Sequence, residues 1–71
     1  MNSIIEARET LREELLKEIA RNDHYTMNLN SERSRLHKEH SLSYNLMKWL
    51  DKKITEAIEY NFSLIKQLQE L

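Results

Sequence analysis

The chain has 71 residues, which allows one small domain, and a formal net charge of -1 at pH 7, which is not the basic excess typical of nucleic-acid-binding domains. It contains no Cys, Gly or Pro, which excludes disulfides and thiolate metal sites and argues against hairpin strands and tight loops. No apolar run reaches the roughly 18 residues needed to cross a bilayer. We therefore expect an all-α, cytoplasmic protein without a membrane span or a cleaved signal.

The first helix is expected over about residues 4–22. Ser3 and Glu6 have the spacing of a capping box, which marks a helix N-terminus. Apolar residues then recur every three or four positions, as in a helix with one buried face. The expected hairpin core consists of four residues of this helix and one of the next: Ile4, Leu11, Leu15, Ile19 and Leu36.

A turn is expected over about residues 23–30. The segment from Asn22 to Ser31 is rich in Asn, which tolerates left-handed backbone and competes for backbone hydrogen bonds. In a chain without Gly, Asn is the best turn former available. A break in the polar stretch His40–Ser43 would instead give a compact three-helix bundle, and the sequence leaves this alternative open.

The second helix is expected over about residues 31–70, because its apolar residues follow the alternating four-and-three spacing of a coiled-coil seam. From Met47 onward, seven of the eight seam positions are apolar. Asn61 occupies the remaining position, where a buried Asn can fix the register of the pairing.

These elements predict one domain, residues 1–71, folded as an antiparallel helical hairpin with a short first helix and a long second helix. At 1.5 Å per residue the helices would measure ~28 Å and ~60 Å, so half of the long helix would lack a neighbour. Because its apolar surface is wide, we expect a second copy or a protein partner to cover it. The expected interface residues are Met47, Trp49, Leu50, Ile54, Ile58, Tyr60, Phe62, Ile65 and Leu68.

The charges form three blocks along the chain. Residues 1–23 carry four basic and six acidic groups, residues 24–53 carry six and three, and residues 54–71 carry one and three. Acidic ends that flank a basic middle favour an antiparallel arrangement, either of the first helix on the second or of two copies.

Little in the sequence suggests catalysis, and we expect no enzyme, cofactor or metal site. The chain has no Gly-rich phosphate loop and no nucleophile elbow. His37 and His40 are one helical turn apart, but a zinc site needs three or four ligands. His40 also falls on the predicted seam, where protonation would place a charge in the interface.

The function we expect is that of a protein-interaction module, namely a small adaptor, chaperone or inhibitor. The alternative is a DNA-associated regulator that uses the basic middle of the chain, with nucleic acid the less favoured partner. In size, and in the order of a short helix before a longer one, the expected layout resembles the hairpin co-chaperones that hold needle subunits of type III secretion systems. This resemblance rests on layout alone.

Overall fold

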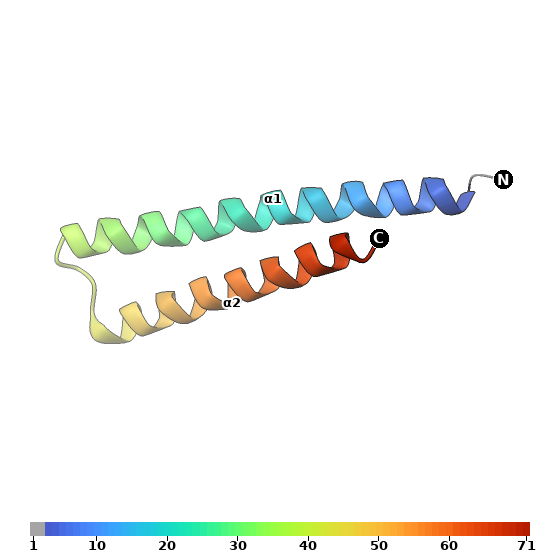
Figure 1. Cartoon of the computed structure of the whole chain (residues 1–71). Helices are drawn as coiled ribbons and strands as arrows, with labels where there is room; N and C mark the ends of the chain where they lie inside the picture. The colour runs from blue at the N-terminus through green and yellow to red at the C-terminus, as the bar shows by residue number, and fades with distance from the viewer. Residues whose placement is uncertain (1–2) are drawn as a thin grey trace.

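The computed structural model describes residues 3–71, which form two antiparallel helices joined by one turn (Figure 1). Helix α1 spans Ser3–Lys38 and helix α2 spans Tyr44–Gln69. The hairpin is a thin rod with principal extents of 60 × 15 × 12 Å. No strand or third helix occurs in residues 3–71, so the prediction of an all-α helical hairpin is confirmed.

The predicted helix bounds are wrong. The first helix has 36 residues and the second has 26, so the long helix precedes the short one. Residues 23–30 are helical throughout, and the chain reverses at residues 39–43, which include the polar stretch His40–Ser43 where a break would have given the alternative three-helix bundle. The reversed order also removes the layout on which the resemblance to the secretion co-chaperones rested.

The Asn-rich segment stays helical because its side chains bond along and across the helices instead of turning the backbone. The Thr26 hydroxyl donates to the carbonyl oxygen of Asn22 at 2.9 Å, and the Asn30 amide donates to that of Thr26 at 3.2 Å. Asn22 is buried and donates to the carbonyl oxygen of Ala57 on α2 at 2.7 Å. Asn22, a residue typical of turns, thus joins the two helices here, while Thr26 and Asn30 bond back along α1.

The turn is built by local hydrogen bonds that close one helix and open the next. His40 adopts a left-handed φ of 58°, the Ser41 N–H donates to Leu36 O at 2.9 Å, and the His40 N–H donates to His37 O at 3.1 Å. This is a Schellman C-cap with His in the position usually taken by Gly. Ser43 then caps α2, since its hydroxyl accepts from the Leu46 N–H at 3.2 Å.

Replacing His40 by Gly is expected to raise the free energy of unfolding by up to about 1 kcal/mol. The left-handed conformation costs a residue with a Cβ about 1–2 kcal/mol, and Gly loses part of that gain through its freedom in the unfolded chain. Urea denaturation followed by circular dichroism measures the change. His37→Gly, within α1, is the control and should destabilise the hairpin. If both variants lost stability equally, the backbone at His40 would not limit the turn.

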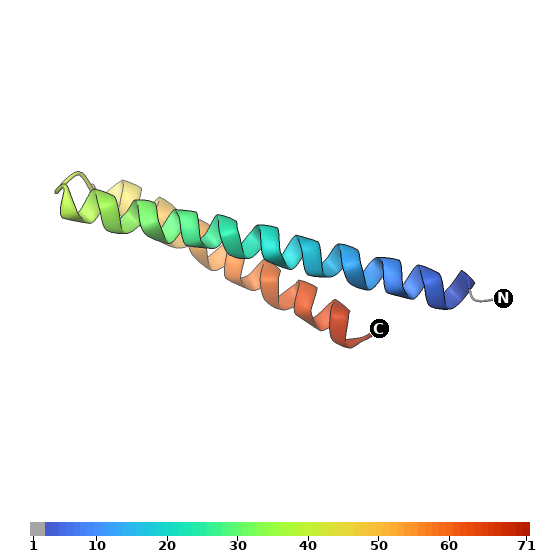
Figure 2. The same ribbon diagram turned by 90° about the horizontal axis from the view of Figure 1, so that it is seen from above.

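The helices pack along one seam that repeats every seven residues on each side. On α2, Leu50, Ala57 and Leu64 are buried. The α1 side of the seam has Leu15 and Asn22 buried and Leu29 and Leu36 half-buried, again at seven-residue steps. This spacing is that of an antiparallel coiled coil, and Figure 2 shows that the two helix axes are inclined to each other.

Because α1 is the longer helix, its first turns extend past the C-terminus of α2 (Figure 1). The turn also folds the basic middle of the chain onto itself and brings the two acidic segments together. One end of the rod, residues 24–53, has six basic and three acidic groups, whereas the open end combines the two acidic segments. The expected pairing of the acidic first segment with the basic middle therefore does not occur within the chain.

Candidate protein interface

The histidines singled out from the sequence are apart from the seam. His37 lies in the last turn of α1, and His40 is exposed in the turn between the helices. The expectation that His40 lies in an interface along the seam is therefore wrong for the hairpin itself. Over residues 3–71, no three His, Cys, Asp or Glu side chains are placed to hold a metal ion.

Three of the five residues expected in the hairpin core lie at or beside the seam. Leu15 is buried, and Ile19 and Leu36 are half-buried. Ile4 and Leu11 are exposed, because they lie in the N-terminal turns of α1, which extend past the shorter α2. Their inclusion in the core was wrong, since it followed from a first helix too short to extend past the second.

The nine predicted interface residues divide into three groups. Leu50 is only 2% exposed, and it is covered by the chain's own α1, so it cannot contact a partner while the hairpin stays closed. A second group is half-buried along or beside the seam: Met47, Ile54, Ile65 and Leu68. The third group is exposed: Trp49, Ile58, Tyr60 and Phe62.

The side of the rod that carries Ile58 can be identified from two polar contacts. Asn61 Nδ2 donates to Asp23 Oδ1 at 3.1 Å, and Arg33 Nε lies 2.8 Å from Asp51 Oδ1 as an ion pair that falls short of hydrogen-bond geometry. These contacts place Asp23 and Asp51 on the same side of the rod. Ile58 follows Asp51 by one heptad and therefore shares that side.

Three more apolar side chains lie on this side. Ile65 follows Ile58 by seven residues and Phe62 follows it by four, while Leu16 on α1 precedes Asp23 by seven. The antiparallel register brings Leu16 within about one helical turn of Ile65 along the rod. Phe62 is 67% exposed, Leu16 is 50% and Ile58 is 43% exposed. We call these four residues, Leu16, Ile58, Phe62 and Ile65, the apolar flank.

The opposite side of the rod is more polar. The Tyr60 hydroxyl donates to Glu18 Oε1 at 3.3 Å, and desolvation together with the negative charge of Glu18 raises the pKa of Tyr60. The Lys53 ammonium lies 5.9 Å from the centre of the Trp49 ring. Tyr60 and Trp49 thus contact charged groups of their own chain, which makes this side a poorer apolar docking surface.

The seam contains a polar residue that the sequence analysis missed. Asn22 was assigned to a turn, yet it lies on the buried seam of α1. Its place on the seam could have been predicted from its spacing, because it belongs to a series at seven-residue steps: Leu15, Asn22, Leu29, Leu36. Asn61 does lie at the helix–helix contact, as expected of a seam residue, while its role in setting the register stays a prediction.

Half of the basic residues proposed for DNA contact already pair with carboxylates. Arg33 pairs with Asp51, Lys53 with Glu56, and Arg35 with two glutamates, Glu32 and Glu39. Hydrogen bonds from Arg35 lower the pKa of Glu32. These pairs reduce the positive charge that the basic middle offers to phosphates.

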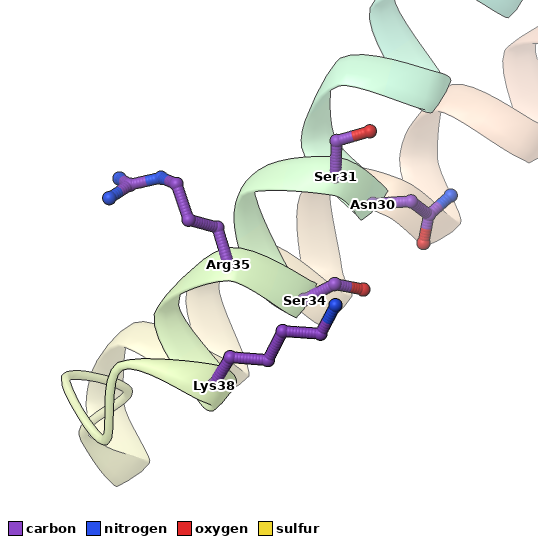
Figure 3. A pocket seen from close by; sticks show the side chains of 5 residues that line it. All are labelled: Asn30, Ser31, Ser34, Arg35 and Lys38. Carbon is purple, nitrogen blue, oxygen red and sulfur yellow. The ribbon is translucent and has the colours of Figure 1, made fainter.

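A shallow depression of about 460 Å³ lies beside Arg35, lined by Asn30, Ser31, Ser34, Arg35 and Lys38. Figure 3 shows that all five side chains come from the same stretch of α1. Because no second element encloses it, the depression is an open part of the helix surface and not a built ligand site.

Neither α1 nor α2 has the length of apolar sequence that a bilayer crossing requires. The chain matches no protein-family model, no curated protein and no solved structure.

Proposed function

We propose that this chain is a non-enzymatic protein-interaction module that binds a helical surface through its apolar flank. The supporting observation is the exposure of large apolar side chains in adjacent turns of α2, with Leu16 of α1 beside them. Phe62 supports it most strongly, because an aromatic ring two-thirds exposed beside two isoleucines is typical of an interface anchor. An adaptor, a chaperone and an inhibitor would all use such a surface.

The area that the chain exposes supports the same proposal. The hairpin exposes 5775 Å², whereas a compact monomer of 8.6 kDa would expose about 4,700 Å². The difference, about 1,100 Å², exceeds the roughly 800 Å² that each partner buries in a standard interface. A two-helix rod with few buried residues gains stability when a further helical layer covers it.

The dye ANS, which binds exposed apolar surface, tests this proposal together with sedimentation of the chain over a range of concentrations. Either concentration-dependent association or ANS binding by a folded chain is expected, and Phe62→Asp should abolish whichever is found while leaving the helical circular dichroism unchanged. Tyr25→Asp is the control and should change neither, because this exposed aromatic residue follows Glu18 by one heptad and therefore shares the Tyr60 side of the rod. A folded chain that stays monomeric and does not bind ANS would refute the proposal.

A further inference from the structure

Resting on the proposed function, we infer that the apolar flank binds a second copy of this chain in the antiparallel sense, forming a four-helix bundle around a two-fold axis near Phe62. Three features of the molecule support this dimer: the charge distribution along the rod, the position of the apolar flank and the area left exposed. Each of these is a property of the hairpin and not of its separate helices.

The hairpin is electrically polar along its length. Its turn end, residues 24–53, has three more basic than acidic groups, and its open end has nine acidic and five basic groups. Two copies side by side in the same direction would place like charges together at both ends. Two copies in opposite directions place each basic turn end beside an acidic open end, so electrostatics favours the antiparallel pair.

The apolar flank lies near the middle of the rod. Its members on α2 run from Ile58 to Ile65, and in the antiparallel register these are level with about residues 14–26 of α1. This is close to the midpoint of the rod, about residue 22 of α1. A two-fold axis through the flank therefore lets the two rods overlap along nearly their whole length. It also places Phe62 next to its own copy, which makes the apolar contact self-complementary.

The same axis predicts which charges meet. Glu9 and Glu13 share a side of α1 with Leu16, and Glu6 precedes Glu13 by one heptad. Lys48 precedes Phe62 by two heptads on α2 and shares its side, and Lys52 lies one turn further along. Rotation about Phe62 brings these lysines level with the first turns of α1 in the second copy.

None of the ion pairs within residues 3–71 involves Glu6, Glu9, Lys48 or Lys52. Lys48 instead lies over the Tyr44 ring, 5.2 Å from its centre. The chain's own fold therefore leaves these four charges for contacts with the second copy.

Sedimentation equilibrium of the full chain tests whether a second copy covers the apolar flank. The wild type is expected to be a dimer, Phe62→Asp and Ile58→Asp folded monomers, and Tyr25→Asp a dimer. If the wild type were a folded monomer that binds ANS, the flank would not bind a second copy, but the proposed function would still hold. A monomer that does not bind ANS would overturn both.

The orientation is tested by a nitroxide label on Ser41→Cys, which introduces a single thiol into a chain that has none. Pulsed electron–electron double resonance measures the distance between the two labels. In an antiparallel dimer this distance is roughly the 60 Å length of the rod. A parallel dimer brings them within about 20 Å, since neighbouring helices lie 8–10 Å apart. The short distance would overturn the antiparallel arrangement.

Charge reversal tests the paired ends. Glu6→Lys with Glu9→Lys, and separately Lys48→Glu with Lys52→Glu, should each weaken self-association about tenfold at low salt. An equimolar mixture of the two variants should regain wild-type affinity, because each open end then meets a turn end of opposite charge. If the mixture were no tighter than either variant alone, the assigned contacts would be wrong.

Discussion

Replacing Asn22 by Asp is expected to destabilise the hairpin by about 3–5 kcal/mol at neutral pH, because it creates a buried charge without a partner. Asn22 is 8% exposed, and its Nδ2 donates to the carbonyl oxygen of Ala57 at 2.7 Å. A carboxylate of the same shape has no proton to donate and would turn a negative charge toward that oxygen. The neighbouring Asp23 adds a like charge.

The loss of stability caused by Asn22→Asp should disappear at acid pH. Burial raises the pKa of the introduced carboxyl above its unfolded value of about 3.9, so the folded state holds the proton more tightly. Relative to the wild type, stability is therefore retained below the unfolded pKa and lost as pH rises through the folded pKa. Thermal melts of both proteins over the acid range measure this difference.

The control for this prediction is Asn28→Asp, the same change at an exposed position of α1. A solvated carboxylate keeps its hydration, so this variant should differ from the wild type by less than about 0.5 kcal/mol and show no acid rescue. If both variants behaved alike, the cross-helix hydrogen bond of Asn22 would not exist in solution.

Replacing Leu50 by Ala is expected to cost about 2–5 kcal/mol and to leave the chain largely unfolded. Leu50 is 2% exposed, the lowest exposed fraction among the buried residues of the seam. Its truncation removes apolar contacts at the turn end of a seam formed by only two helices, where few other side chains are available to fill the cavity. The single core of a domain of this size rarely contributes more than about 3–5 kcal/mol to the free energy of unfolding.

Far-UV circular dichroism and urea denaturation measure the loss. Leu11→Ala is the matched control, because Leu11 is exposed near the open end of α1 and its truncation should cost less than about 1 kcal/mol. Equal losses from the two substitutions would mean that the helices do not pack along the seam described here.

The helical class and the seam of α2 were predictable because they depend on a local period. Met47, Leu50, Ile54 and their successors repeat at heptad spacing, and this pattern does not depend on where the chain turns. The position of the turn was not predictable in the same way. Asn22 and Asn30 favour turns in isolation, whereas in the hairpin Asn22 bonds across to α2 and Asn30 bonds back along α1, so both stay within the helix.

The candidate interface was predictable on α2 and not on α1. Ile58, Phe62 and Ile65 lie outside the buried part of the seam by their spacing alone, and they are at least partly exposed in the hairpin. Leu16 was missed because its neighbours depend on the antiparallel register, and that register follows from the turn. An error of some fifteen residues in the turn, from about 23–30 to 39–43, thus moved the helix end without a neighbour from the C-terminal part of the chain to the N-terminal part.

The unequal lengths of the two helices also determine where the molecule first opens. The initial turns of α1 have no neighbouring helix, and an isolated helical segment of fewer than about 12 residues is marginal in water. Their amide protons should exchange with solvent well before those around Asn22, and trypsin should cleave after Arg8 earlier than at basic sites beside α2. Slower cleavage after Arg8 would then show that another molecule covers the open end of the rod.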